Sequence, residues 1–277
     1  MTRFSFDRAL SIGRGIGRLM YWVIPKRRRA TAINIALAFP ELNSTEQQKR
    51  VKGVYDHVGM TLAETSWMWF RSLEDVEERF TVSGLNHLNK ALESETGCIL
   101  LQAHFSLLEL SGAYLGPRLP VYAVYGAPKN PMVDAWMLMQ RERRIMHMVE
   151  KRAIRDVVRH LKKGNLAWYS PDQYVSQAHG GILTEYFGQP VLTSNGSARI
   201  VRMTDATIIP MIPTRHKNGE SYHIAFFSPL ELDPEDELGS TQAINDLFEK
   251  QIRQYPEQYI WLHKRFKPPP GETSPYR

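Results

Sequence analysis

The sequence has very little cysteine. Among its 277 residues only Cys98 is a cysteine, and it lies in the apolar run GCILLQ. A single cysteine can form neither an intramolecular disulfide nor a paired-cysteine zinc site. This excludes a disulfide-stabilised scaffold and favours a buried, reduced thiol in a reducing compartment.

Sequence motifs of several common enzyme classes are also absent. There is no G-x-S-x-G nucleophile elbow, no Walker A loop and no H-E-x-x-H zinc motif, and the nine histidines are scattered singly. The stretch GRGIG at 13–17 resembles part of a dinucleotide loop, but no strand precedes it. We therefore expect neither a metal ion nor another cofactor.

Long apolar runs are missing as well, because no uninterrupted stretch approaches the ~20 residues of a membrane-spanning helix. Residues 1–29 still combine apolar side chains with eight basic residues and one acidic residue, whereas the rest of the chain carries 27 basic and 28 acidic groups. This predicts a basic amphipathic membrane-association segment over 1–29, with Tyr21 and Trp22 at headgroup level and PKRRR on an anionic membrane surface. A basic tail that binds nothing, or nucleic acid, is the alternative. No nucleic-acid motif accompanies it, so we expect no nucleic-acid partner.

The remaining chain alternates between strand-like and helix-like stretches. The alternation predicts an α/β fold: a single domain with a mostly parallel or mixed central sheet flanked by helices. We expect the folded domain over 30–267 and an extended C-terminal tail over 268–277. The expected elements are helix 46–71, strand 98–104, strand 121–127, helices 131–148 and 151–163, strand 165–172, helix 197–205, a hairpin of 208–216 with 221–232, and helix 240–254.

One polar pair interrupts the apolar run LLQAHFSLLEL. His104 and Glu109 lie five positions apart, where strand 98–104 ends and the next helix begins. Ligand sites in open α/β sheets lie at this carboxyl edge. A Glu109 carboxylate that accepts the Nδ1 proton of His104 would leave Nε2 free as a base for a hydroxyl. The spacing alone is a weak signal, because a histidine near a glutamate is more often a structural pair.

Five longer segments carry a family resemblance. They are PKRRRATAINIALAFPEL, LLQAHFSLLEL, LKKGNLAWYSPDQ, VLTSNGSARIVRMTDATIIPMIPTR and PEQYIWLHKRFK. Through them the chain resembles, along nearly its whole length, the bacterial lipid A biosynthesis acyltransferases, the late lauroyl and myristoyl transferases. The last segment and the P-D-Q block are specific, whereas H-x4-E alone fits the wider glycerolipid acyltransferase superfamily. The family typically has a membrane-spanning segment where this chain has a short, arginine-interrupted one, which favours peripheral attachment.

The resemblance implies a glycerol-3-phosphate acyltransferase-like fold and an acyl transfer reaction. His104 would be the general base and Glu109 its orienting partner, and Arg141 and Asp172 fall at functional positions of the family. The donor would be an acyl carrier protein thioester or acyl-CoA, and the acceptor a hydroxyl of a lipid A precursor. The basic residues expected to meet phosphates of the acceptor are Arg141, Arg144, Arg199, Lys264 and Arg265.

The implied reaction also sets requirements on the surroundings of the site. Water would hydrolyse the thioester, so the apolar Phe105, Leu107, Leu108 and Leu110 are expected to support a dry acyl pocket. The lipid acceptor implies a position at the cytoplasmic face of the bacterial inner membrane. Two alternatives stay open: an acyltransferase of the same architecture acting on a lysophospholipid, an ornithine lipid or a glycolipid, and a catalytically idle membrane-binding relative.

Overall fold

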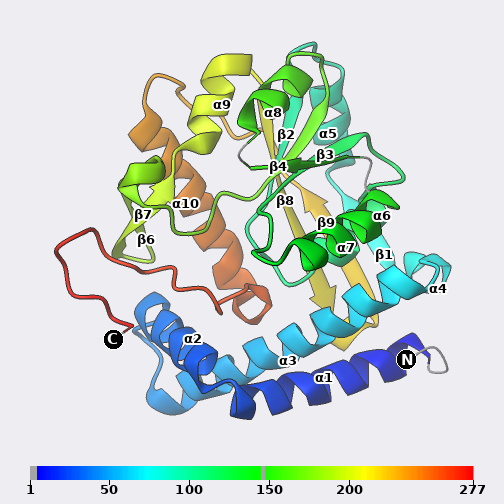
Figure 1. Cartoon of the computed structure of the whole chain (residues 1–277), viewed down its shortest axis with the longest axis vertical. Coiled ribbons are helices and arrows are strands. Elements are labelled where there is room, and N and C mark those ends of the chain that lie inside the picture. The colour runs from blue at the N-terminus through cyan, green and yellow to red at the C-terminus, as the bar shows by residue number, and fades with distance from the viewer. Residues whose placement is uncertain (1–4, 145–146, 152, 277) are drawn as a thin grey trace.

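The computed structural model describes residues 5–144, 147–151 and 153–276, and it is built around a seven-stranded sheet (Figure 1). The strand order is β1-β9-β8-β2-β5-β3-β4, and neighbouring strands are parallel except for the antiparallel pair β8–β9. A separate antiparallel hairpin is formed by β6 and β7. The strands are β1 Phe80–Ser83, β2 Cys98–Leu101, β3 Val121–Tyr125, β4 His147–Glu150, β5 Leu166–Tyr169, β6 Gly181–Tyr186, β7 Gln189–Ser194, β8 Thr207–His216 and β9 Ser221–Phe226.

Helices cover both faces of the sheet. Leu100 of β2 belongs to a core with residues of α1, α3, α5 and α6, whereas Leu101 belongs to a core with residues of α8, α9 and α10. Successive strand residues point to opposite faces, so the fully buried run CILL is apolar throughout. The helices are α1 Phe6–Val23, α2 Pro25–Ala38, α3 Ser44–Phe70, α4 Glu74–Glu77, α5 Leu85–Leu92, α6 Leu108–Leu115, α7 Pro131–Glu142, α8 Ile154–Leu161, α9 Gly196–Thr204 and α10 Glu237–Gln254, with 3₁₀ turns η1 Gln177–His179, η2 Lys217–Gly219 and η3 Pro256–Gln258.

The predicted α/β class with a mixed, mostly parallel sheet is confirmed, but some elements differ. The helix predicted over 131–148 is wrong in its second half: α7 ends at Glu142, and β4 follows beside β3. Residues 145–146 lie outside the described residues. Methionine, arginine and glutamate in this stretch favour a helix, and pairing with β3 overrides that preference. The β6–β7 hairpin was not predicted; its two turn residues, Phe187 and Gly188, both have positive φ.

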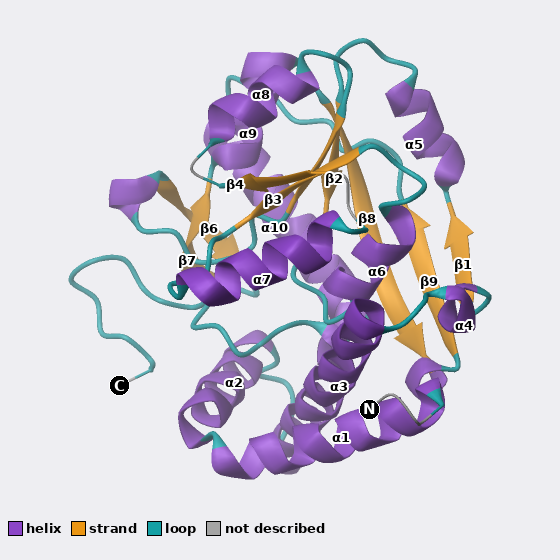
Figure 2. Cartoon of the chain, turned by 45° about the vertical axis from the view of Figure 1, so that its right-hand side comes forward, coloured by secondary structure: helices purple, strands orange, loops and turns teal. Residues whose placement is uncertain are grey.

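Within the predicted membrane-association segment 1–29, the described residues from Phe6 onward lie mostly in α1 and α2, and α1 is part of the folded body. Helix α1 runs alongside α3 in both views (Figures 1 and 2), and Leu10 and Tyr21 are buried. The two backbones approach closely because a glycine faces α3: a Cβ on Gly17 would lie 2.0 Å from the backbone oxygen of Tyr55. One face of this amphipathic helix is therefore covered by protein.

The opposite face of α1 stays exposed. Leu19, Trp22 and Val23 are 59%, 68% and 62% exposed, respectively. Within the described part of the chain, we find no helix with the length and apolar character needed to cross a bilayer.

The C-terminal segment 268–277, predicted as an extended tail, is anchored near its end. The Tyr276 hydroxyl donates to the Asn34 side chain on α2 and accepts from the backbone N–H of Phe266 (2.9 Å). Asn34 in turn donates from Nδ2 to the backbone oxygen of His263 (2.6 Å). These contacts tie the end of the described chain to α2.

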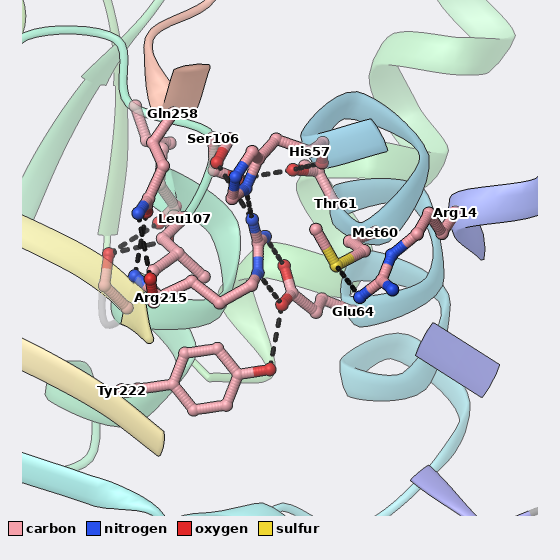
Figure 3. A network of polar contacts seen from close by, with 12 residues as sticks. Arg14, His57, Met60, Thr61, Glu64, Ser106, Leu107, Arg215, Tyr222 and Gln258 are labelled. Atoms are coloured by element: carbon pink, nitrogen blue, oxygen red, sulfur yellow. Dashed lines mark hydrogen bonds and ion pairs between the residues drawn. The ribbon is translucent and has the colours of Figure 1, made fainter. Parts of the chain in front are cut away.

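A buried ion pair joins α3 to the sheet (Figure 3). The side chains of Glu64 and Arg215 are 1% and 0% exposed. Two parallel hydrogen bonds connect them, one of them 2.7 Å from Arg215 Nε to Glu64 Oε1. The Tyr222 hydroxyl on β9 donates to the same carboxylate (2.8 Å). A buried ion pair is stable only when its remaining polar groups are also satisfied, as they are here.

The same guanidinium reaches the loop after β2. Arg215 Nη1 donates to Nδ1 of His57 (2.5 Å) and lies 3.4 Å from the hydroxyl oxygen of Ser106 (Figure 3). Burial and the nearby positive charge of Arg215 lower the pKa of His57 to about 3, so its imidazole is a neutral acceptor. The loop that contains His104 is thereby connected to α3 and β8.

Removing one member of the pair should destabilise the fold strongly. Glu64→Leu would leave the Arg215 charge buried without its carboxylate, at a cost of about 3–5 kcal/mol in the free energy of unfolding. The double variant Glu64→Leu/Arg215→Met should recover most of this loss. Urea unfolding followed by circular dichroism measures both values. Equal destabilisation of the single and double variants would contradict the account.

Candidate active site

His104 and Asp172 come together at one edge of the sheet. Strands β2 and β5 pair in parallel, with Leu101 opposite Tyr169. His104 and Asp172 each follow three residues after this pair, so the two chain segments leave the sheet side by side. This is the carboxyl edge, where ligand sites of open α/β sheets lie.

The Asp172 carboxylate holds both the side chain and the backbone of His104. The imidazole Nδ1 lies 2.5 Å from Oδ1, and the backbone N–H of His104 donates to Oδ2 (3.0 Å). The Tyr259 hydroxyl also donates to Oδ2 (2.8 Å). Asp172 is 1% exposed, whereas the His104 side chain is 24% exposed. The carboxylate is therefore sealed below the ring, and the ring itself reaches the surface.

Burial and charge act against each other in this pair. Burial disfavours the imidazolium, but the charge and hydrogen bond of Asp172 outweigh it, so the pKa of His104 is raised above 6.5. Burial would raise the pKa of Asp172, yet the His104 charge and the hydrogen bonds from His104 and Tyr259 lower it to about 2. Asp172 is thus ionised at neutral pH and fixes the proton of His104 on Nδ1.

The predicted orienting role of Glu109 is wrong, because Asp172 occupies Nδ1 of His104. Glu109 instead binds Arg141 through both carboxylate oxygens, with 3.2 Å between Arg141 Nε and Oε2. The reason is topological. Helix α6 begins at Leu108 and carries Glu109 in its first turn, where the side chain meets the last turn of α7.

The other predicted cationic residues do not gather around His104. Arg144 donates to the backbone oxygen of Arg71 (2.6 Å), and burial lowers its pKa. Arg199 is exposed on α9. Lys264 is exposed, with Nζ 5.5 Å from the ring centre of Tyr276. These residues contact other parts of the fold, so they offer no single phosphate-binding cluster.

Arg265 has a structural environment. It is 2% exposed and donates to the backbone oxygen of Leu192 (3.2 Å) and the hydroxyl of Thr193 (2.6 Å) on β7. Its guanidinium also lies 4.7 Å from the ring centre of Tyr186 on β6. Its charge is therefore buried beneath the β6–β7 hairpin, and its predicted contact with a phosphate stays a prediction.

The apolar residues beside His104 are part of the protein core. Phe105, Leu107 and Leu110 are 0%, 1% and 1% exposed. Leu107 and Leu110 belong to the core on one face of the sheet, and Phe105 belongs to the core on the other face. They make the floor of the site rigid and dry, and they do not line a pocket for an acyl chain.

Three polar residues next to His104 were missed by the sequence analysis. Tyr259 binds Asp172, as described above. The Gln173 side-chain nitrogen lies 3.1 Å from Nε2 of His104 and 3.4 Å from Nε2 of His263. All three belong to segments that carry the family resemblance, SPDQ and QYIWLHK. The signal was present, but spacing cannot show that these segments meet.

Residues 258–263, which follow α10, complete the site by lying against the loop after β2. The backbone N–H of Ser106 donates to the oxygen of Gln258 (2.7 Å), and the N–H of Ile260 donates to the oxygen of His104 (3.0 Å). These bonds hold the loop on both sides of Phe105. The geometry around His104 therefore depends on residues from three distant parts of the chain.

Comparisons with known proteins identify the family of this chain. Residues 2–268 match the family model of the bacterial lipid A biosynthesis acyltransferases. The chain is 31% identical over 267 residues to the lipid A biosynthesis lauroyltransferase of Escherichia coli K12, covering 96% of this chain and 87% of that protein. It is 30% identical over 266 residues to the palmitoleoyltransferase, with the same coverage, and 23% identical over 270 residues to the myristoyltransferase of that strain, covering 96% and 82%. The match over nearly the whole length shows that this chain is an acyltransferase and belongs to the bacterial lipid A biosynthesis acyltransferase family.

Proposed function

We propose that this enzyme transfers a fatty acyl chain from a thioester to a hydroxyl of a lipid A precursor, with His104 as the general base. The observation that carries the proposal is the position of His104. Asp172 holds Nδ1 from below, and the ring is partly exposed, so Nε2 is the nitrogen left for substrate. The donor is an acyl carrier protein thioester or acyl-CoA.

The reaction follows from this geometry. Nε2 of neutral His104 takes the proton of the acceptor hydroxyl while the hydroxyl oxygen attacks the carbonyl carbon of the thioester. The tetrahedral oxyanion collapses, the C–S bond breaks, and the imidazolium returns its proton to the thiolate. Asp172 stays ionised and stabilises the imidazolium. General-base assistance of this kind typically contributes about 10²–10⁴-fold.

Among the predicted cations, Arg141 is connected to the His104 loop through its partner Glu109, five residues after His104. The ion pair uses part of the guanidinium, which has five N–H donors in all. The remaining donors suit a phosphate of the acceptor, and Glu109 fixes their direction. In this proposal Glu109 orients the cation rather than the base.

The exposed face of α1 is proposed as the membrane contact. Leu19 and Trp22 project from it. A groove of about 510 Å³ beside Trp22 is lined by the cations Arg18, Lys49 and Lys52 together with two carboxylates, Glu257 and the Asp56 that pairs with Arg18. Apolar side chains next to basic ones suit an anionic membrane surface. The protein would lie at the cytoplasmic face of the bacterial inner membrane, where a lipid acceptor and a thioester donor can meet.

The product of the reaction tests the proposed function. Purified enzyme is incubated with acyl carrier protein thioester or acyl-CoA and a tetra- or penta-acylated lipid A precursor, and the lipid is analysed by mass spectrometry. We expect the lipid to gain one acyl ester, and we expect His104→Ala to lower the rate of its formation by about 10²–10⁴-fold. His179→Ala, on the exposed turn η1, is the matched control with unchanged activity. Acylation of lysophospholipid but not of the precursor would assign another acceptor, and no product with either would indicate an idle relative.

The pH dependence distinguishes Asp172 from Glu109 as the partner of His104. The base must be neutral, so kcat/KM should fall as pH drops below the raised pKa of His104. Asp172→Asn removes the charge that raises this pKa. The acidic limb should therefore move to lower pH, and the plateau should fall by about 10²–10⁴-fold. In Glu109→Gln the limb should not move. A shifted limb in Glu109→Gln with an unshifted one in Asp172→Asn would reverse the assignment.

Surface substitutions test the membrane contact without removing α1, whose other face is needed for folding. Leu19→Ser/Trp22→Ser should weaken sedimentation with phosphatidylglycerol vesicles by about tenfold or more, since each buried apolar side chain contributes about 1.5–3 kcal/mol. Leu183→Ser on β6, where Leu183 is 49% exposed, is the matched control. Unchanged binding of the double variant would place the contact on another surface.

A further inference from the structure

The side chain of Gln173 occupies the place that the substrate hydroxyl needs. Its amide nitrogen lies 3.1 Å from Nε2 of His104, the nitrogen that must take the hydroxyl proton. Because Nδ1 carries the proton shared with Asp172, Nε2 of the neutral ring is an acceptor, and the amide donates to it. A hydroxyl that binds Nε2 must therefore displace this amide.

His263 provides a second support for the same amide. Its Nε2 lies 3.4 Å from the Gln173 nitrogen, and the two imidazole centres are 6.3 Å apart. Burial and the nearby charge of His104 lower the pKa of His263, so its ring is neutral and can accept the second N–H. The amide thus bridges the two imidazoles, and it keeps its hydrogen bond to His263 when a hydroxyl displaces it from His104.

Both ends of this bridge are fixed by the fold. Gln173 directly follows Asp172, whose carboxylate is locked by three hydrogen bonds. The backbone oxygen of His263 accepts from Asn34 Nδ2 (2.6 Å) and from the N–H of Arg265 (3.0 Å). Neither residue depends on the other for its backbone position. The amide can therefore move at its own side-chain torsions while the site around it stays in place.

We propose that the Gln173 amide, displaced from His104 by the acceptor hydroxyl, donates to the oxyanion of the thioester tetrahedral intermediate, and that His263 positions it. This deepens the proposed function and rests on it. An alcohol oxygen on Nε2 attacks a carbon about 3 Å away, so the carbonyl oxygen lies within a small side-chain movement of the amide nitrogen. A neutral N–H donor can stabilise the developing negative charge without surrendering a proton.

The reaction kinetics of Gln173 variants test this role. We expect Gln173→Ala to lower kcat by about 10²–10³-fold without raising the KM of either substrate, because the oxyanion contact forms only in the transition state. Gln173→Glu should be slower still at high pH, since a carboxylate repels the oxyanion. Its charge should also raise the pKa of His104 and move the acidic limb of the pH profile to higher pH. Gln177→Ala, on the exposed turn η1, is the matched control with unchanged kinetics.

His263 is tested as a positioning residue by a double-mutant cycle. His263→Ala alone should lower kcat by about three- to tenfold, the value of one hydrogen bond. Added to Gln173→Ala it should cost nothing more, because the group it positions is gone. His263→Asn, which keeps a polar side chain, should recover part of the loss. Thermal unfolding of every variant should stay close to the parent, as both side chains are at least partly exposed.

The outcomes separate this inference from the proposed function. If His104→Ala is inactive while Gln173→Ala keeps kcat within about twofold, the base stands and the oxyanion role is overturned. A Gln173→Ala effect confined to KM would also overturn it. So would a double variant whose loss in kcat equals the product of the losses in Gln173→Ala and His263→Ala. Activity retained in His104→Ala would instead reject the proposed general base itself.

Discussion

The hydrogen bond between His104 and Asp172 is the interaction on which the site depends. It exists because β2 and β5 are parallel neighbours and deliver one residue each to the same edge. The buried carboxylate supplies a full negative charge directly beneath the ring. That charge fixes which nitrogen carries the proton, and in the proposed reaction it would stabilise the imidazolium.

The rest of the molecule holds this bond in place from several directions. The Glu64–Arg215 pair connects α3 and β8 to Ser106, two residues beyond the imidazole. Residues 258–263 add the hydrogen bond from the Tyr259 hydroxyl to the Asp172 carboxylate and backbone hydrogen bonds to the loop after β2. These supports are buried and hydrogen-bonded, so they resist movement. Their geometry explains why a chain end so distant in sequence belongs to the active site.

The surface around the base divides the remaining tasks between separate elements. Glu109 and Arg141 join α6 to α7, while Gln173 and His263 lie over the outer nitrogen of the base. The apolar exposed residues of α1 lie on a helix whose other face packs on α3. Acyl transfer at a lipid surface requires all three functions: a base, oriented polar groups and a lipid contact. In the proposed function, each would be supplied by a different part of one α/β domain.

The sequence by itself determined the class of fold and the family, and it placed His104 at the end of a strand. Continuous apolar strands alternating with helices are a local pattern, and the strand-end location of His104 follows from it. The sequence also contained the segments that carry Asp172, Gln173, Tyr259 and His263. Pairing between them was not readable, because it depends on which strands are neighbours, and strand order is a property of the whole sheet.

Tertiary structure decided which charge meets which partner. Spacing placed Glu109 beside His104, but the direction of α6 turned that carboxylate toward Arg141 and left Nδ1 to Asp172. Arg265 looked like a free cation in a basic run, yet it is buried under a hairpin that sequence patterns did not predict. The sequence showed that α1 is amphipathic, but only its packing on α3 showed which part of its apolar surface is covered by protein. Long-range packing settles such choices, because a side chain binds the partner that the fold brings within hydrogen-bonding distance.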